Sequence, residues 1–526
     1  MDDALNGLRD EQPQDGGSQD EVIRFLSNPA IYGEDGPVER VETHAAHVFL
    51  CGETALKIKR AVKYDYLDFS SLEQRQAMLH RELELNHPTA PMIYEDVVPV
   101  TREADGCLAL DGNGPPVEWV LRMWRFPAEM EFSAIAERGE LTDVLADRLG
   151  HAIADYHANS EPREDDGAVL MAEIVEELRL AFSEMEEELG TERIAGFLEG
   201  CERQLAAVAE TLTARSSAGH VRRCHGDLHL CNIVLVDGHP VPFDALEFNE
   251  TFGICDVLYD LAFLVMDLRH EGLGRAANMV LNAYLYTERG MEDPGVAAMP
   301  LFIAVRAGIR AMVEIHTDHA RSTPGRSVAE ARAYLDEALE VLSPPAPRLI
   351  AIGGRSGSGK STLSRSLAPL FGAAPGAVHI RSDLERKAIF CVDPLTHLPP
   401  DSYSKVVNRH VHQRLRIRAE TILAAGYSVL LDAVYLTGSE RVALVELAER
   451  IGVPFDGIWL EVDPDRLLAR VAARQDDASD ADETVVRQQL LNDAGEVEWP
   501  HVDATGPREQ TFEQTCRILG LNGGAT

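Results

Sequence analysis

The chain has 526 residues, of which 45% are hydrophobic and 26% are charged, and its formal net charge is −38. This length favours two or three domains, and the composition excludes a fibrous or a disordered protein. The acidic balance argues against a nucleic-acid partner, because phosphate backbones bind basic surfaces. No apolar run reaches the roughly 18 residues of a membrane-spanning helix, and the first residues do not resemble a signal peptide. We therefore expect a cytoplasmic protein with no membrane partner.

Cysteine and lysine usage limits the kinds of site that the chain can carry. The eight cysteines form no CxxC pair, so the sequence predicts neither a zinc site nor a disulfide framework. Only six of the 49 basic residues are lysines, at positions 57, 59, 63, 360, 387 and 405. Because an ammonium group is a compact partner for phosphate, these few lysines mark candidate phosphate sites.

The first part of the chain combines strands with helices. Residues 1–20 are polar and acidic, which predicts a flexible tail. The apolar pattern then predicts strands at 47–51 and 54–59, a helix at 72–85 and a strand at 117–124. Residues 140–220 and 255–340 are predicted to be largely helical, with a hairpin at 233–236 and 240–244 between them.

The pattern changes after the Pro-rich segment 343–347, which predicts a stiff connector. Continuous apolar strands are then predicted at 348–352, 377–381, 427–432 and 457–462, with helices between them. This alternation is typical of βαβ units with a buried parallel sheet.

Residues 225–232 read His-Gly-Asp-Leu-His-Leu-Cys-Asn, which is the spacing of a kinase-type catalytic loop. Asp227 is placed to accept the proton of an attacking hydroxyl, while Asn232 and the later Asp244 offer oxygen ligands to Mg²⁺. An isolated His-Gly-Asp could equally be a turn, but Asn232 and Asp244 at the expected offsets favour the functional interpretation. His225 and His229 are interpreted as supports of the loop, and Asp260 as an anchor of the following helix.

A nucleotide grip for this loop is predicted in the strand at 54–59. Lys57 lies in an Ala-Leu-Lys-Ile context, where it could hold the α and β phosphates of ATP. Glu82, on the following helix, could pair with Lys57 and fix its position. Lys59 lies on the same face of the strand, so the sequence leaves open which lysine contacts the nucleotide.

At these residues the sequence resembles the aminoglycoside phosphotransferase family, over about residues 40–340. The resemblance implies a bilobal kinase-like fold with ATP between the lobes. It matches Asp227 to the catalytic aspartate, Asn232 and Asp244 to the magnesium ligands and Lys57 to the nucleotide lysine. The chain departs from the family at 43–47, which read Thr-His-Ala-Ala-His in place of a glycine- or serine-bearing phosphate loop. It departs more mildly after the metal aspartate, which is followed by Ala-Leu-Glu-Phe at 245–248 and not by the family's usual aromatic residue.

A P-loop pattern, G-x-x-x-x-G-K-S, begins at Gly354 after an apolar strand. Its glycines let backbone N–H groups converge on phosphate at a helix N-terminus. Lys360 is predicted to reach the β and γ phosphates, and the Ser361 hydroxyl to bind Mg²⁺. The predicted nucleotide-binding residues are Gly354, Ser356, Gly357, Ser358, Gly359, Lys360, Ser361 and Thr362.

Further candidates follow the later strands. Asp383 is a candidate base toward an acceptor hydroxyl with Arg386 beside the transferred phosphate, although Ser382-Asp383 could instead cap a helix. Asp432 fits a Walker-B-like magnesium position. Arg470 and Arg474, before the acidic segment 477–482, suggest a lid over the phosphate, although they could be ordinary surface arginines.

This part, from 348 to about 515, resembles the gluconate-kinase, zeta-toxin and polynucleotide-kinase group of P-loop kinases. The order of the two modules resembles a bacterial family of phosphotransferase/P-loop fusions. The expected fold is therefore α+β followed by α/β: a bilobal kinase-like domain and a parallel-sheet P-loop kinase domain. The expected boundaries are a tail at 1–20, a kinase-like domain at 21–343 (lobes about 21–125 and 126–343), a linker at 344–347 and a P-loop domain at 348–526.

The leading hypothesis is a kinase that uses ATP and Mg²⁺ to phosphorylate a hydroxyl of a small molecule such as a sugar or an amino sugar. A second hypothesis makes one module a sensor that regulates the other. A third is a polynucleotide 5′-kinase or zeta-toxin-like kinase, against which the net charge of −38 weighs. The sequence leaves the acceptor and the oligomeric state open.

Overall fold

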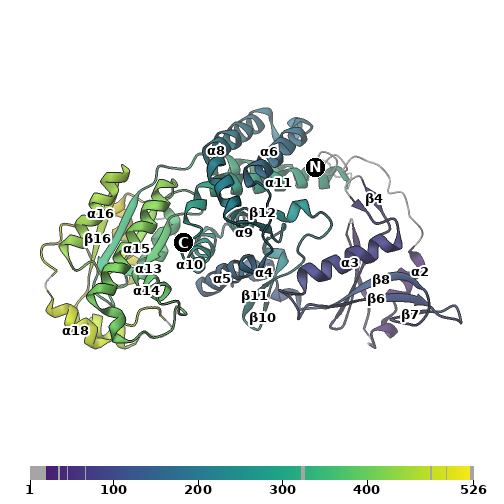
Figure 1. Ribbon diagram of the computed structural model, residues 1–526, viewed down its shortest axis with the longest axis horizontal. Coiled ribbons are helices and arrows are strands. Elements are labelled where there is room, and N and C mark those ends of the chain that lie inside the picture. Colours follow the sequence, from purple (N-terminus) through teal and green to yellow (C-terminus); the bar gives the residue numbers. More distant parts are fainter. Residues whose placement is uncertain are drawn as a thin grey trace. The chain divides into compact units, whose positions relative to one another are not determined.

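The computed structural model describes residues 19–33, 36–43, 45–64, 67–320, 326–473, 477–492 and 494–521 (Figure 1). Most of the predicted tail, together with Arg474 and His44, lies outside these residues. The chain forms two compact units: unit 1 comprises Met1–Thr142, Asp155–Asp267 and Ala304–Leu339, and unit 2 comprises Asp143–Ala154, Leu268–Ile303 and Glu340–Thr526. Two segments that precede the Pro-rich connector therefore group with the P-loop part of the chain.

Unit 1 contains a six-stranded antiparallel sheet with the order β1-β2-β3-β8-β6-β7. Its strands are β1 (Glu39–Glu42), β2 (Ala46–Cys51), β3 (Thr54–Lys59), β6 (Tyr94–Arg102), β7 (Leu108–Leu110) and β8 (Pro116–Trp124). The helix α3 (Leu72–Asn86) packs against β6 and β8, and a capping box of Ser71 and Gln74 fixes its start. The predicted strands and helix of this region are confirmed, whereas β1, β6 and β7 were not predicted.

Helices make up most of the rest of the chain before the connector. They are α5 (Asp143–Asn159), α6 (Gly167–Ser183), α7 (Glu186–Leu189), α8 (Thr191–Ser217), α9 (Val257–His270), α10 (Gly274–Thr287), α11 (Met299–Ala320) and α12 (Val328–Val341). The short helices α2 (Asp20–Leu26) and α4 (Phe132–Glu137) flank the sheet region in sequence. Helices α6 and α8 run side by side (Figure 1).

Short strands frame the predicted catalytic loop in unit 1. β9 (Val221–Arg223) precedes the loop and pairs with β12 (Ile254–Asp256), while β10 (Ile233–Val236) and β11 (His239–Pro242) form the predicted hairpin after it. The two-residue strands β4 (Lys63–Tyr64) and β5 (Leu67–Asp68) form a separate pair. The loop is thus held at both ends by strand pairing.

One helical stretch among the described residues, Asp293–His319, is long and apolar enough to cross a membrane by length and composition. Of its most apolar window, 78% is buried inside the structure. The core helix of a folded domain has the same composition, so this stretch is weak evidence for a membrane span.

Unit 2 contains a five-stranded parallel sheet with the order β14-β15-β13-β16-β17. The strands are β13 (Leu349–Gly354), β14 (Val378–Arg381), β15 (Val429–Asp432), β16 (Phe455–Glu461) and β17 (His501–Asp503). The first four confirm the prediction, and β17 was missed because it is three residues long with one buried side chain. The chain leaves β13 in one direction and later returns past it in the other, which places a topological switch at its carboxyl end.

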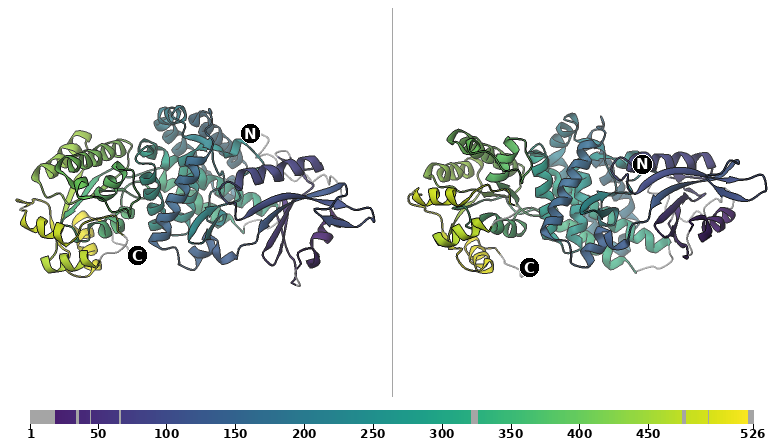
Figure 2. Two further views of the ribbon diagram at one scale, coloured as in Figure 1. Left: turned by 60° about the horizontal axis from the view of Figure 1, so that its bottom comes forward. Right: turned by 90° about the horizontal axis from the view of Figure 1, so that it is seen from below.

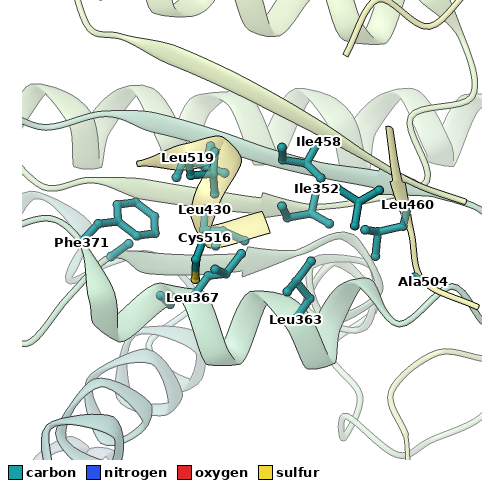
Figure 3. Packing of buried hydrophobic residues seen from close by; sticks show 14 residues of the cluster. Ile352, Leu363, Leu367, Phe371, Leu430, Ile458, Leu460, Ala504, Cys516 and Leu519 are labelled. Carbon is teal, nitrogen blue, oxygen red and sulfur yellow. The ribbon is translucent and has the colours of Figure 1, made fainter. Parts of the chain in front are cut away.

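Helices cover the parallel sheet (Figure 2). They are α13 (Lys360–Leu367), α14 (Ser382–Ile389), α15 (Lys405–Ala424), α16 (Gly438–Ile451), α17 (Pro464–Ala472), α18 (Glu483–Leu491) and α19 (Arg508–Leu519). Figure 3 shows Leu363 and Leu367 of α13, Leu519 of α19 and Ile352, Leu430 and Ile458 of the sheet in one buried cluster. This packing holds α13, and with it the P-loop, against the centre of the sheet.

Trp499 packs against β16. Its indole lies over Gly457, where a Cβ atom would overlap the ring, and it packs edge-on against Tyr435 and Phe455. We expect Gly457→Ala to lower the free energy of unfolding of unit 2 by about 1–3 kcal/mol, since an overpacked core strains its neighbours. Urea unfolding followed by tryptophan fluorescence measures this change.

Gly438→Ala is the matched control. Gly438 lies in α16, and the added Cβ would come no closer than 3.8 Å to the side chain of Arg441. This control should leave stability unchanged or raise it by up to about 1 kcal/mol. Equal stability of Gly457→Ala and the wild type would show that Trp499 can move aside.

Candidate active sites

The predicted catalytic loop of unit 1 is built around the buried carboxylate of Asp260 in α9. One oxygen of this carboxylate accepts the N–H of His225 at 3.0 Å and the other accepts the N–H of Gly226 at 2.9 Å. Gly226 has φ +85°, which favours glycine. Burial would raise the pKa of Asp260, but the hydrogen bond and charge of His157 outweigh it and hold that pKa well below its usual range. Asp260 therefore anchors the loop backbone, which corrects its interpretation as a helix anchor.

The ring of His225 links the loop to the segment that carries Asp244. Its Nδ1 accepts the N–H of Asp227 at 3.3 Å, and its Nε2 lies 2.8 Å from the carbonyl oxygen of Phe243. These two contacts require a neutral ring that donates through Nε2, and burial lowers the pKa of His225 in agreement. His225 thus supports the loop, as predicted.

Asp227 and Asn232 lie in direct contact. The amide nitrogen of Asn232 donates to the carboxylate of Asp227 at 3.0 Å and to its backbone carbonyl at 2.9 Å. This contact leaves the amide oxygen of Asn232 as the atom that would face a metal. The Asp227 side chain is 42% exposed, so it is open to an acceptor.

His229 sets the charge state of Asp227. The two side chains lie 3.4 Å apart. Burial would raise the pKa of Asp227, but the hydrogen bond and charge of His229 outweigh it and lower that pKa to about 2. Burial would lower the pKa of His229, but Asp227 raises it to about 10. Asp227 is therefore ionised at neutral pH, and the raised pKa of His229 favours its charged form, in which Nδ1 would no longer accept the N–H of Cys231 that lies 3.3 Å away.

Two lysines of β3, the partly buried Lys57 and the buried Lys59, share one glutamate of α3. Lys57 Nζ lies 2.7 Å from one oxygen of Glu82 and 3.1 Å from Asp244, while Lys59 Nζ lies 2.7 Å from the other oxygen of Glu82. Lys59 also pairs with Glu247. Burial would raise the pKa of Glu82, but the two ammonium groups lower it to about 2. Because Lys57 alone contacts Asp244, the geometry favours Lys57 as the nucleotide lysine.

Asp244 is held in an uncommon backbone conformation with φ +59°. Its N–H donates to the hydroxyl oxygen of Tyr94 at 3.0 Å, and the next N–H, of Ala245, donates to Asn86 at 2.8 Å. Both partners come from the small-lobe sheet and α3. The structure thus joins Lys57, Glu82 and Asp244, which lie far apart in the sequence.

Sequence reasoning missed Arg306, which supports the loop from α11. Its guanidinium is buried, donates to the carbonyl of Gly226 at 3.2 Å and stacks over the ring of Tyr259 at 3.9 Å. Only the fold brings Arg306 to the loop, since 80 residues separate it from Gly226.

In unit 2, the P-loop has the backbone that its glycines predict. Gly354, Gly357 and Gly359 have φ +137°, +85° and +93°, values that strain other residues. Lys360 begins α13, followed by Ser361 and Thr362, and its Nζ donates to the carbonyl of Arg355 at 3.2 Å. The P-loop thus ends where the helix begins, as the motif requires.

Ser361 and Asp432 meet at the carboxyl ends of neighbouring strands. The Ser361 hydroxyl donates to the Asp432 carboxylate. Burial would raise the pKa of Asp432, but His379 and Lys360 outweigh it and keep that pKa well below its usual range. A hydroxyl and an ionised carboxylate in contact are suitable ligands for Mg²⁺.

Asp383 lies in the first turn of α14 and does not cap it. The N-cap position is Arg381, and no side chain caps this helix, so the capping alternative is wrong. Burial raises the pKa of Asp383. Arg386 follows on the same face, donates to the carbonyl of Ser402 at 2.8 Å and lies over the ring of Tyr403.

The predicted lid residues take different places. Arg470 donates to the carbonyl of Ala504 at 2.8 Å, and Arg474 lies outside the described residues, so their lid role stays a prediction. The acidic segment 477–482 instead contacts Arg381 and the helix α14. Asp477 lies 3.4 Å from Arg381, and Asp480 accepts hydrogen bonds from buried Lys387 at 2.7 Å and from Tyr403 at 2.6 Å. Sequence reasoning missed Asp480 and Lys387 as partners.

Two family models match this chain, one in each part. Residues 71–295 match the model of the phosphotransferase enzyme family, and residues 349–492 match that of the AAA domain. The chain is a fusion of these two domains. The fusion is a kinase. Its predicted fold class, a kinase-like α+β domain followed by a parallel-sheet P-loop domain, is confirmed.

Similar proteins cover the whole fusion or one domain. Uncharacterized proteins of Mycobacterium tuberculosis and Mycobacterium bovis are 28% identical over 493 residues, which is 91% of the fusion and 94% of each relative. A sugar kinase of Janibacter sp. HTCC2649 is 20% identical over 33% of the fusion and 95% of its own chain, with a TM-score of 0.27. A choline/ethanolamine kinase family protein of Mesorhizobium loti is 15% identical over 62% of the fusion and 94% of its own chain, with a TM-score of 0.39.

The His229–Asp227 pair makes the stability of unit 1 depend on pH. Because the pKa of His229 is raised, its stabilisation is fully present below the unfolded value of about 6.5 and is lost as pH rises toward about 10. We expect His229→Gln to destabilise the protein at pH 6, with the difference from wild type shrinking steadily between pH 7 and 10. Urea unfolding across this range measures the difference.

His87→Gln, which changes an exposed histidine, is the control and should show no such trend. A difference for His229→Gln that stays constant with pH would mean that His229 carries no charge in the folded protein.

Proposed function

We propose that the fusion is an ATP- and Mg²⁺-dependent small-molecule kinase that moves the γ-phosphate of ATP to a hydroxyl group, with a nucleotide site in each unit. The acceptor would be a sugar, an amino sugar or a similar compound. The observation that carries the proposal is the cluster of Lys57, Glu82 and Asp244, because 187 residues separate Lys57 from Asp244. A short sequence motif can occur by chance, whereas a cluster of residues this far apart in the sequence requires the whole fold. Its ammonium and carboxylate groups are those that would hold phosphate and metal.

In unit 1, Asp227 would receive the proton of the acceptor hydroxyl. Its lowered pKa keeps it ionised at neutral pH, and such a weak base suits a loose transition state in which the proton leaves late. Lys57, fixed by Glu82, would hold the nucleotide phosphates. Asp244 and the amide oxygen of Asn232 would hold Mg²⁺, which supplies the positive charge that phosphoryl transfer needs.

In unit 2, Lys360 and the N–H groups of the P-loop would bind the β and γ phosphates. Ser361 and Asp432 would hold the metal. Asp383 is the proposed base, and its raised pKa makes it a better proton acceptor than an ordinary exposed aspartate. Arg386, one turn further along α14, would face the acceptor or the transferred phosphate.

A regulatory role for unit 1 is the second candidate. The segment that should cover the phosphates there has no glycine, and two of its N–H groups are occupied: that of Thr43 donates to the carbonyl of Ala46 at 2.9 Å, and that of Ala46 donates to the Thr43 hydroxyl at 3.0 Å. A phosphate loop needs free backbone N–H groups and close approach. Unit 1 would then bind a ligand and control the P-loop domain.

The two candidates are separated by ADP release measured against a panel of sugars, amino sugars and nucleosides. Each of Asp227→Asn and Lys360→Ala should abolish a different substrate-dependent activity, by at least about 10³-fold, because each removes an interaction of the transition state. If Lys360→Ala removed every activity while Asp227→Asn only shifted apparent affinities, unit 1 would be the sensor. Equal loss of one activity in both variants would show a single site.

The two lysines of β3 give a further prediction. Lys57→Met should weaken nucleotide binding to unit 1 about 10-fold or more, because it removes the ammonium beside Asp244. Lys59→Met is the matched variant on the same strand face and should reduce nucleotide affinity much less. Its main effect should be lower stability, since Glu82 and Glu247 would lose a buried partner.

Equilibrium dialysis with labelled ATP in a Lys360→Ala background measures the binding to unit 1 alone. A stronger loss of binding in Lys59→Met than in Lys57→Met would assign the nucleotide to Lys59.

A further inference from the structure

Gln489 of α18 contacts the P-loop although no motif includes it. Its side-chain oxygen accepts the backbone N–H of Ser356 at 2.9 Å, and its side-chain nitrogen donates to the Ser356 hydroxyl at 3.0 Å. Its backbone carbonyl accepts a hydrogen bond from Arg355 at 3.2 Å. Ser356 itself is buried, with 7% of its surface exposed. One residue therefore satisfies three polar groups of the turn that precedes the phosphate-binding glycines.

The neighbouring helix holds the next residue of the same turn. A Cβ atom at Gly357 would lie 2.9 Å from Val471 and 3.0 Å from the carbonyl oxygen of Leu467, so α17 packs directly against the glycine. Leu467 and Val471 also form a buried cluster with Val486 of α18. Helices α17 and α18 thus act as one body that touches Ser356 and Gly357 at once.

Asp480, in the segment that connects the two helices, contacts α14 and the residues that follow it. Asp480 precedes α18 by three residues and binds Lys387 and Tyr403 in its buried ion-pair network. The start of α18 is therefore fixed to α14, while its last turn carries Gln489. This fixes the position from which Gln489 meets the P-loop.

We propose that Gln489 is a positioning residue for the nucleotide site of unit 2: it holds the Ser356 turn so that the following N–H groups are already aimed at phosphate. The inference rests on the proposed nucleotide site of the P-loop. A loop that is ordered before binding loses less conformational entropy when the phosphates arrive.

A carboxamide suits this position better than other side chains. It accepts from the N–H and donates to the hydroxyl at the same time, which an apolar side chain cannot do. It also carries no charge. A carboxylate at the same place would accept from Ser356 as well, but its negative charge would repel the phosphates nearby.

The experiment uses the full-length protein and measures the Mg·ATP and Mg·ADP binding that Lys360→Ala removes. Gln489→Met keeps the volume of the side chain and removes its polar contacts, so we expect roughly tenfold weaker binding of both nucleotides. The kcat of the Lys360-dependent activity should change less than threefold while KM for ATP rises in proportion. Gln489→Glu should weaken ATP binding more than ADP binding, because ATP carries one more charge.

Gln488→Ala, which changes the exposed neighbour of Gln489, is the control and should bind like wild type. Unchanged or tighter binding in Gln489→Met would overturn the inference, as would a fall in kcat without a change in KM. If Gln489→Met does not fold, the folded Gln489→Glu variant decides: equal losses of ATP and ADP binding would overturn the inference. Nucleotide binding that is insensitive to Lys360→Ala would instead refute the proposed P-loop site.

Discussion

Buried charges need partners, and this requirement fixes the side chains that support the candidate sites in both units. A charge removed from water costs far more than an exposed one unless an opposite charge or a set of hydrogen bonds compensates it. Asp260 meets this need with two backbone N–H groups and His157, Glu82 with two lysines, and Asp480 with Lys387 and Tyr403. Each compensation joins segments that are distant in sequence. The same interactions that make the charges tolerable therefore also fix the geometry of the sites.

In unit 1 this pairing produces a loop that is rigid before any ligand arrives. The Asp260 carboxylate accepts a hydrogen bond from the N–H of Gly226, and the Arg306 guanidinium donates one to the carbonyl of the same residue. His225 then transmits that position to Phe243, beside Asp244. The candidate base and the candidate metal ligand are thus tied to one support. Groups that are ordered before the substrate binds are a principal means by which enzymes lower the activation free energy.

Local spacing made part of this arrangement predictable. The offset from Asp227 to Asn232 and the whole P-loop lie within eight residues each, so the backbone alone brings their side chains together. Strands β13 and β15 were equally clear, since all of their residues are buried and all but the final Asp432 are apolar or glycine. The short or mixed strands β1, β7 and β17 lacked such a pattern, because edge strands bury little.

Contacts over long separations were beyond sequence reasoning. Lys57 and Lys59 occupy equivalent positions of one strand face, and only the partners Asp244 and Glu247 distinguish them. Arg306 and Gln489 carry no signal because a buried arginine or a helical glutamine is compatible with many roles. The rarity of lysine was a partial guide: Lys57 and Lys360 lie at the candidate phosphate positions, but Lys387 is committed to Asp480.

The balance of charge in the Lys57 cluster indicates what unit 1 is prepared to bind. Lys57 and Lys59 face three carboxylates, those of Glu82, Asp244 and Glu247. Glu82 is fully buried and occupied by both lysines, whereas Asp244 is 44% exposed and bound only on one side by Lys57. In the proposed complex, a hard cation would bind the exposed oxygen of Asp244, and Lys57 would then be released from Asp244 toward phosphate. The same charged groups would therefore form the ion pair of the free protein and the contacts of the proposed complex.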